Sequence, residues 1–248
     1  EVVQLLLERC NSEESGLNIK DEFGWTPFMV ACSIGHKDIV KLFLEHLDPN
    51  IDLNARKNDG RTALMLACYF GHKDIVILLL DLSDSIVLNT KDEEGSTALM
   101  LACYNGHKDV VQLLLDHSDT NIDLNARTNN GWTAFMHACS NGYKDVVKLL
   151  LDHSGSEIIN FNAKDNRVEK TGFMRACENG NTNVVKLILD HSDRIELNAR
   201  SNNGMNAFMI ACNWGRTDVV QLLLDNSERI ELNASSDCGT TAFMITCR

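Results

Sequence analysis

Apolar and polar residues follow a pattern that returns about every 35 residues along the chain. Each copy starts with an apolar stretch such as Thr-Ala-Phe-Met-x-Ala-Cys, and a glycine stands three residues after the cysteine. A second apolar stretch, of the form Asp-Val-Val-x-Leu-Leu-Leu, follows. Within each stretch the apolar residues recur at the spacing of a helix face. The pattern therefore predicts a repeat protein with two short helices in each repeat.

The first helix of each repeat has start and stop signals. A threonine before the apolar stretch can accept a hydrogen bond from a free backbone N–H, as an N-cap does. The glycine after the cysteine can take the positive φ that ends a helix. An aspartate in the first turn of the second helix suits the helix dipole. We expect first helices directly after these residues: Thr26, Thr62, Thr97, Thr133, Thr171, Asn206 and Thr241.

A polar segment with a turn glycine connects one repeat to the next. Residues 124–131 read Leu-Asn-Ala-Arg-Thr-Asn-Asn-Gly, and we interpret such segments as extended fingers or hairpins. The first and last segments each hold one helix of the pair, so further repeats are expected beyond both. We predict one domain over residues 1–248, with repeats at 1–20 (half), 21–56, 57–91, 92–127, 128–165, 166–200, 201–235 and 236–248 (half).

These residues resemble the ankyrin signature T-P-L-H-x-A-A-x-x-G-H. Residues 26–36 read Thr-Pro-Phe-Met-Val-Ala-Cys-Ser-Ile-Gly-His, and similar segments recur along essentially the whole chain. Methionine replaces the first histidine of the signature in every copy, and we expect its thioether to fill a buried space. The resemblance implies an all-α fold, an ankyrin repeat solenoid of stacked helix–turn–helix units with projecting finger loops.

The charge and the hydropathy of the chain exclude some classes of partner. The formal net charge is −12, which argues against nucleic acid and against anionic membrane surfaces. No apolar run reaches the roughly 18 residues that span a bilayer, so we expect no membrane insertion. The N-terminal residues also lack the pattern of a secretory signal peptide.

The cysteines and histidines recur with the repeat and do not form a catalytic or metal-binding motif. Equivalent positions in neighbouring repeats should lie roughly 10 Å apart, too far for a disulfide, which needs about 7 Å or less between Cα atoms. We therefore expect free core thiols, a reducing cytoplasmic location, and no catalytic residues, metal or cofactor. Cys10 and Cys238 lie outside the pattern, where exposure is expected.

The residues that break the repeat are the candidates for partner binding. In ankyrin-like stacks, partners usually bind a concave side made by the fingertips and the first, inner helices. All three tryptophans and two of the three tyrosines fall on the variable positions there, and such residues dominate binding hot spots. The predicted site residues are Phe23, Trp25, Ile34, Arg61, Tyr69, Phe70, Tyr104, Trp132, Met205 and Trp214.

The fifth repeat is irregular, with a longer loop at residues 161–170 and Glu169 where glycine is expected. Arg167, Lys170 and Arg175 predict a locally basic surface, whereas the first three fingers are acidic. The hypothesis is that this polarity fixes the direction of a bound partner.

The favoured function is a protein-interaction scaffold that acts as a monomer and binds a protein or peptide. One alternative is a targeting or regulatory ankyrin module of a larger enzyme or effector. Another is a substrate of an asparagine hydroxylase, because segments 52–54 and 123–125 resemble hydroxylated ankyrin asparagines at Asn54 and Asn125.

Overall fold

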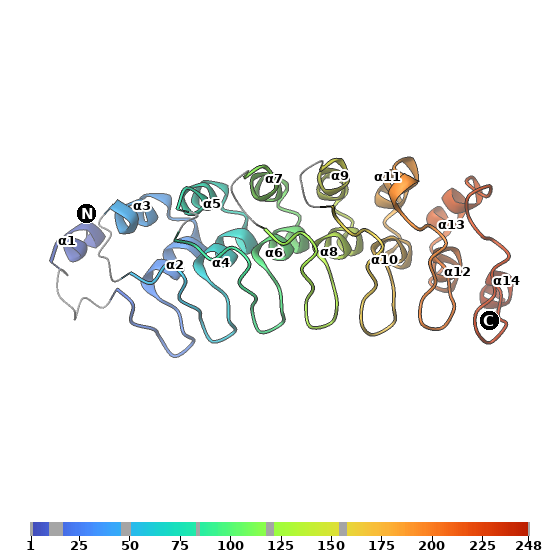
Figure 1. Ribbon diagram of the computed structural model, residues 1–248, viewed down its shortest axis with the longest axis horizontal. Coiled ribbons are helices and arrows are strands. Elements are labelled where there is room, and N and C mark those ends of the chain that lie inside the picture. Colours follow the sequence, from blue (N-terminus) through green and yellow to red (C-terminus); the bar gives the residue numbers. More distant parts are fainter. Residues whose placement is uncertain are drawn as a thin grey trace. The chain divides into compact units, whose positions relative to one another are not determined.

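The computed structural model describes residues 2–9, 17–45, 51–82, 85–117, 122–153 and 158–247 (Figure 1). Within these residues the secondary structure is helical, apart from one isolated bridge between Ser235 and Thr241. The helices fall into two compact bodies, residues 1–123 and 124–248. We call them the N-terminal body and the C-terminal body, and each is described by itself.

The N-terminal body pairs each inner helix with an outer helix, as the repeat pattern predicted. Inner helix α2 contacts α4, and α4 contacts α6, while each packs against the outer helix that follows it. The outer helices also contact one another in order. The inner helices are α2 (Pro27–Ile34), α4 (Ala63–Phe70) and α6 (Ala98–Asn105), and the outer helices are α1 (Val2–Arg9), α3 (Lys37–Glu45), α5 (Lys73–Leu80) and α7 (Lys108–Asp116).

The C-terminal body has the same arrangement, with α10 in contact with α8 and α12, and α12 in contact with α14. A short 3-10 helix, η1 (Ser192–Arg194), follows one outer helix. The inner helices are α8 (Ala134–Asn141), α10 (Gly172–Asn179), α12 (Ala207–Asn213) and α14 (Ala242–Thr246), and the outer helices are α9 (Lys144–Asp152), α11 (Thr182–Asp190) and α13 (Thr217–Leu224).

The predicted helix signals are confirmed at the inner helices. In α2 the Thr26 hydroxyl accepts a hydrogen bond from the Met29 N–H at 3.3 Å, and the other inner helices have the equivalent contact. In α12 the acceptor is the side-chain oxygen of Asn206. Gly35 then ends α2 with a φ of 86°. The His72 ring fills the space where a side chain at Gly35 would project, since an added Cβ would lie 2.7 Å from it.

The core consists of the residues that repeat. The signature-position methionines of the six complete repeats are at most 2% exposed, so the predicted burial of their thioethers is confirmed. Met244, in the last inner helix, is exposed, as is the neighbouring Phe243. Among the described residues no outer helix follows α14, so none of them packs on α14 as an outer helix does on the other inner helices.

The fingers are hairpins that hydrogen-bond to one another, which confirms their interpretation from sequence. In the first finger the Asp21 N–H donates to the Trp25 carbonyl at 3.0 Å. The next finger is attached through the Asn58 N–H, which donates to the Phe23 carbonyl at 3.0 Å. In the C-terminal body the Asn166 N–H donates to the Asn130 carbonyl in the same way, at 2.9 Å. The tips are therefore held at a fixed spacing within each body.

Asparagine side chains join the bases of neighbouring fingers. The Asn54 amide donates to the Ser85 carbonyl at 2.7 Å, and its oxygen accepts from the Val87 N–H at 2.8 Å. Asn125 makes the equivalent pair of bonds to Ile158 and Asn160. Asn162 and Asn198 repeat this bridge further along. The recurring asparagine is thus a structural connector between successive loops.

Candidate partner-binding surface

The ten residues predicted to bind a partner all keep some contact with solvent. Seven lie in the N-terminal body and three in the C-terminal body. Five are exposed, namely Phe23, Ile34, Phe70, Tyr104 and Trp214. The other five are half-buried, namely Trp25, Arg61, Tyr69, Trp132 and Met205.

Four of these residues stand at the C-terminal ends of the consecutive inner helices α2, α4 and α6. We call Ile34, Tyr69, Phe70 and Tyr104 the helix-end row. The ring centres of Tyr69 and Phe70 are 5.0 Å apart in an edge contact. Within the N-terminal body these side chains form the exposed apolar part of the helix ends.

Two histidines fix the helix-end row from the neighbouring outer helices. The Nε2 atom of His72 lies 2.8 Å from the Ser33 carbonyl, and its ring stacks on Phe70 with centroids 6.1 Å apart. The Nε2 atom of His107 lies 2.8 Å from the Tyr69 carbonyl. Each histidine therefore connects one inner helix end to the next repeat, which is a structural role.

A lysine or arginine side chain of the same chain stacks on the ring of three of the predicted aromatic residues. The Lys57 ammonium lies 5.2 Å from the Trp25 ring centre. The Arg61 guanidinium lies 4.9 Å from Tyr69, and Arg61 also pairs with Asp92 at 3.4 Å. Such stacking stabilises a ring where it stands. These half-buried rings are thus part of the framework of the fingers as well as of the surface.

The third stacked ring, Trp132, belongs to an ionic cluster in the C-terminal body. The Arg175 guanidinium lies 4.9 Å from the Trp132 ring centre and pairs with Asp165 and Glu178 at 2.9 Å and 2.8 Å. Lys170 also pairs with Glu178, at 2.8 Å. Burial raises the pKa of Asp165, but hydrogen bonds from backbone N–H groups and the Arg175 charge outweigh it and hold that pKa below its usual value.

The ionic cluster corrects the expected basic surface of the fifth repeat. Lys170 and Arg175 are both paired with carboxylates, so their charge is largely neutralised. Arg167 is exposed. Glu169 is the one non-glycine residue with a positive φ, 53°, among the described residues, so it adopts the turn conformation of the glycine that it replaces.

His137 lies beside this cluster; sequence reasoning did not select it, and it selected Arg175 only as part of an expected basic surface. Its ring centre is 5.0 Å from that of Trp132, and burial lowers the pKa of His137 to about 4. The signal was present in the repeat, because the positions of His137 and Arg175 are occupied by Leu66, Leu101 and Ile210 elsewhere. Polar residues at an apolar repeat position mark this part of the surface as specialised.

The remaining predicted residues occupy the sixth repeat. Met205 lies half-buried on the finger, with its sulfur 3.4 Å from the Asn203 side-chain nitrogen. Trp214 follows α12 as its C-cap residue and is exposed. Neither residue has the row of aromatic neighbours found in the N-terminal body.

The cysteines carry no sign of a reactive site. The eight cysteines among the described residues are free thiols, and burial raises the pKa of Cys68, Cys103 and Cys177 above its usual value. Cys238 is exposed as predicted, and Cys10 lies outside the described residues. The part of the chain that the structure describes contains no group of three or more His, Cys, Asp or Glu side chains that could hold a metal ion.

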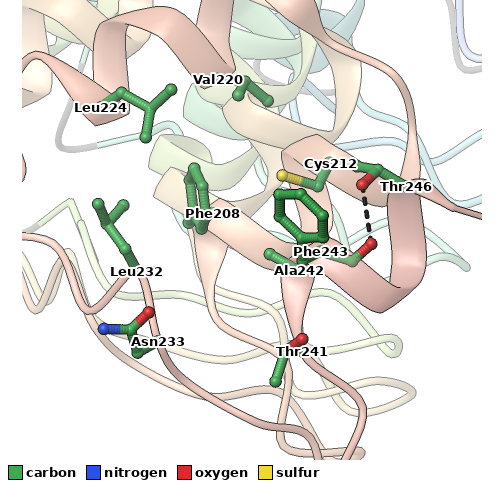
Figure 2. A pocket seen from close by; sticks show the side chains of 10 residues that line it. All are labelled: Phe208, Cys212, Val220, Leu224, Leu232, Asn233, Thr241, Ala242, Phe243 and Thr246. Atoms are coloured by element: carbon green, nitrogen blue, oxygen red, sulfur yellow. Dashed lines mark hydrogen bonds between the residues drawn. The ribbon is translucent and has the colours of Figure 1, made fainter.

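A hollow lined mainly by apolar side chains lies among α12, α13 and α14 (Figure 2). It has a volume of about 450 Å³, and Phe208, Leu224 and Phe243 are among the side chains that line it. In the complete repeats an outer helix packs on the corresponding face of each inner helix. The hollow is therefore explained by the helix pattern, and we do not assign it to a small ligand.

The two bodies differ strongly in charge. Residues 1–123 contain 10 lysines and arginines and 21 aspartates and glutamates, a net charge of −11. Residues 124–248 contain 13 and 14, a net charge of −1. Nearly all of the net charge of the chain therefore lies in the body that carries the helix-end row.

Paired helices with hydrogen-bonded fingers define an α-helical repeat protein, and the comparisons with known proteins identify its kind. A family model described as ankyrin repeats in three copies matches residues 1–92, 84–165 and 156–236. The chain belongs to the ankyrin repeat family. The methionine and cysteine that replace signature residues are thus variations within this family.

Solved structures agree with this assignment. The ankyrin repeat domain of Bcl-3, described as a unique member of the IkappaB protein family, matches with a TM-score of 0.75 and 26% identity, over 90% of this chain and 95% of that one. The human ASB11 ankyrin repeat domain matches with a TM-score of 0.72 and 18% identity, over 89% and 91%. No curated protein sequence matches the chain. Among the described helices, none is long and apolar enough to cross a bilayer.

Proposed function

We propose that the chain is a non-catalytic scaffold that binds a partner protein or peptide through its inner-helix ends and fingers. Ankyrin repeat domains generally mediate protein–protein interaction. The observation that carries the proposal is the exposure of Ile34, Phe70, Tyr104 and Trp214 at positions where large apolar side chains are not needed for the core. Large apolar residues grouped at the surface of a soluble protein mark interaction sites.

The free thiols fit a reducing compartment, so a cytoplasmic location is part of the proposal. The asparagine bridges support a structural role for Asn54 and Asn125, because both side-chain amides already bond to the next loop. The scaffold function is therefore favoured over a function as a hydroxylase substrate.

The test uses the exposed residues, because Trp25, Tyr69 and Trp132 also support the fingers. The variant Ile34→Ala/Phe70→Ala/Tyr104→Ala/Trp214→Ala is compared with the wild type by quantitative pull-down and mass spectrometry. The matched control replaces Val87 and Ile158, which are exposed aliphatic residues outside this surface. We expect the test variant to lose specific partners while the control keeps them. Retention of every partner by the folded test variant would refute the proposal.

A further inference from the structure

We infer that the helix-end row of the N-terminal body receives a basic segment of the partner protein. This inference rests on the function proposed above and adds the chemistry of the ligand. The row places three exposed apolar side chains on consecutive inner helices of the body that carries nearly all of the net negative charge.

The ends of the inner helices α2, α4 and α6 are more apolar than those of α8 and α10. Ile34, Phe70 and Tyr104 are 58%, 48% and 47% exposed at the ends of α2, α4 and α6. In the C-terminal body Trp214 stands at the position of Ile34 and Phe70 in the sixth repeat, but the last two positions hold Ser140 and Asn141 in α8 and Glu178 and Asn179 in α10. The Asn179 amide donates to Ser140. These polar side chains satisfy one another, whereas the row leaves aromatic and aliphatic surface open to a partner.

The helix ends and the fingertips of the N-terminal body both favour a positively charged ligand. Helix C-termini carry partial negative charge, which favours cations. The fingers of the same repeats expose Glu22, Glu93 and Glu94. With a net charge of −11, this body attracts a basic segment and repels an acidic one.

The surface already accepts cations from its own chain. Lys57 lies over Trp25, and Arg61 lies over Tyr69, at 5.2 Å and 4.9 Å from the ring centres. The aromatic side chains of Phe70 and Tyr104 are also exposed in the same row. Arginine or lysine side chains of a partner would bind there by the same cation–π attraction, with apolar residues between them covering Ile34.

The inference is tested by selecting ligands from a phage-displayed library of random dodecapeptides on the full chain. We expect peptides enriched in arginine and lysine, interspersed with apolar residues. Fluorescence anisotropy of the selected peptides should show binding at least tenfold weaker to Phe70→Ala/Tyr104→Ala, while Ile158→Ala, at an exposed position of the C-terminal body outside the candidate surface, binds normally. Thermal denaturation verifies that each variant is folded.

A second variant tests charge without touching the aromatic residues. Glu22→Gln/Glu93→Gln/Glu94→Gln should weaken peptide binding at least fivefold at low salt, and should flatten its dependence on salt. The inference would be overturned if the selected peptides need Phe70 and Tyr104 but lack basic residues, or if they bind the glutamine variant as tightly as the wild type. Either result would leave the scaffold function standing. If no selected peptide depends on Phe70, Tyr104 or Trp214, both proposals fail.

Discussion

The Arg175 guanidinium lies 4.9 Å from the centre of the Trp132 ring, and the same group pairs with Asp165 at 2.9 Å. Arg175 therefore links a ring on the fourth finger to a carboxylate on the fifth. The Asp165 side chain is only 1% exposed, so the pair is shielded from solvent. A buried carboxylate is costly once its cation is removed.

Replacing Arg175 should destabilise the C-terminal body. Arg175→Leu introduces the apolar residue type that Leu66 and Leu101 provide in other repeats, but it leaves Asp165 without its ion pair. We expect a loss of about 2 to 4 kcal/mol in the free energy of unfolding, measured from urea denaturation followed by tryptophan fluorescence. The control is Lys164→Ala, which removes the exposed pair with Glu169 and should cost less than about 1 kcal/mol. Equal losses in both variants would contradict the prediction.

The fold could be predicted from the sequence because its determinants are local and repeated. Thr26 and Gly35 specify the two ends of an inner helix through short-range hydrogen bonds, and the same residue types return in the other complete repeats, except that Asn206 replaces the threonine in one of them. The ionic cluster could not be predicted, because Asp165, Arg175 and Glu178 are brought together by the course of one irregular finger. The spacing of these residues along the sequence does not indicate which charged side chains form ion pairs.

Stability should depend on the protonation of His137 under mildly acidic conditions. Burial lowers its pKa from 6.5 to about 4 in the folded chain, so the unfolded chain binds the additional proton between these values. The contribution of the uncharged His137 to the free energy of unfolding is therefore complete above pH 6.5, and it is lost as the pH falls towards 4. We expect a decrease of up to about 3 kcal/mol in the free energy of unfolding across this range, measured by urea denaturation at several pH values.

The variant His137→Leu should reduce this decrease, while His36→Gln, which changes an exposed histidine, should not. The protonation of Asp165 takes place below this pH range. Its pKa is lowered from 3.8, so its contribution is present above that pH and is lost at still lower pH. A pH profile of His137→Leu that coincides with the wild-type profile between 6.5 and 4 would show that this histidine is not responsible.

The asparagine bridges should contribute measurably to the cohesion of successive repeats. Asn54→Ala removes one donor and one acceptor, leaving the Ser85 carbonyl and the Val87 N–H without that partner. We expect a loss of about 1 to 3 kcal/mol and faster hydrogen exchange at the Val87 amide. Asn183→Ala, at an exposed position of α11, is the control, with a change below about 0.5 kcal/mol. Unchanged exchange at Val87 would count against the connecting role.

The candidate surface was only partly predictable, for a physical reason that Trp25 and Phe70 illustrate. Both are large aromatic residues at variable repeat positions, so from the sequence alone they are equally good candidates for partner binding. In the structure Lys57 stacks on Trp25, whereas Phe70 remains 48% exposed. Exposure is decided by side chains from neighbouring repeats, which the pattern within one repeat does not contain.

Glu169 should be the one fingertip where glycine improves stability. Its φ of 53° lies in the left-handed region, which costs a residue with a Cβ about 1 to 2 kcal/mol. Glu169→Gly relieves this strain but adds freedom to the unfolded chain, so we expect a net gain of about 0.5 kcal/mol. The opposite change at the first finger, Gly24→Ala, should cost at least about 1 kcal/mol, because its Cβ would meet the Asn58 backbone nitrogen at 2.6 Å. Thermal unfolding of both variants measures whether each substitution raises or lowers stability. If Glu169→Gly is destabilised, the contact of the Glu169 side chain with Lys164 contributes more to stability than the backbone strain costs.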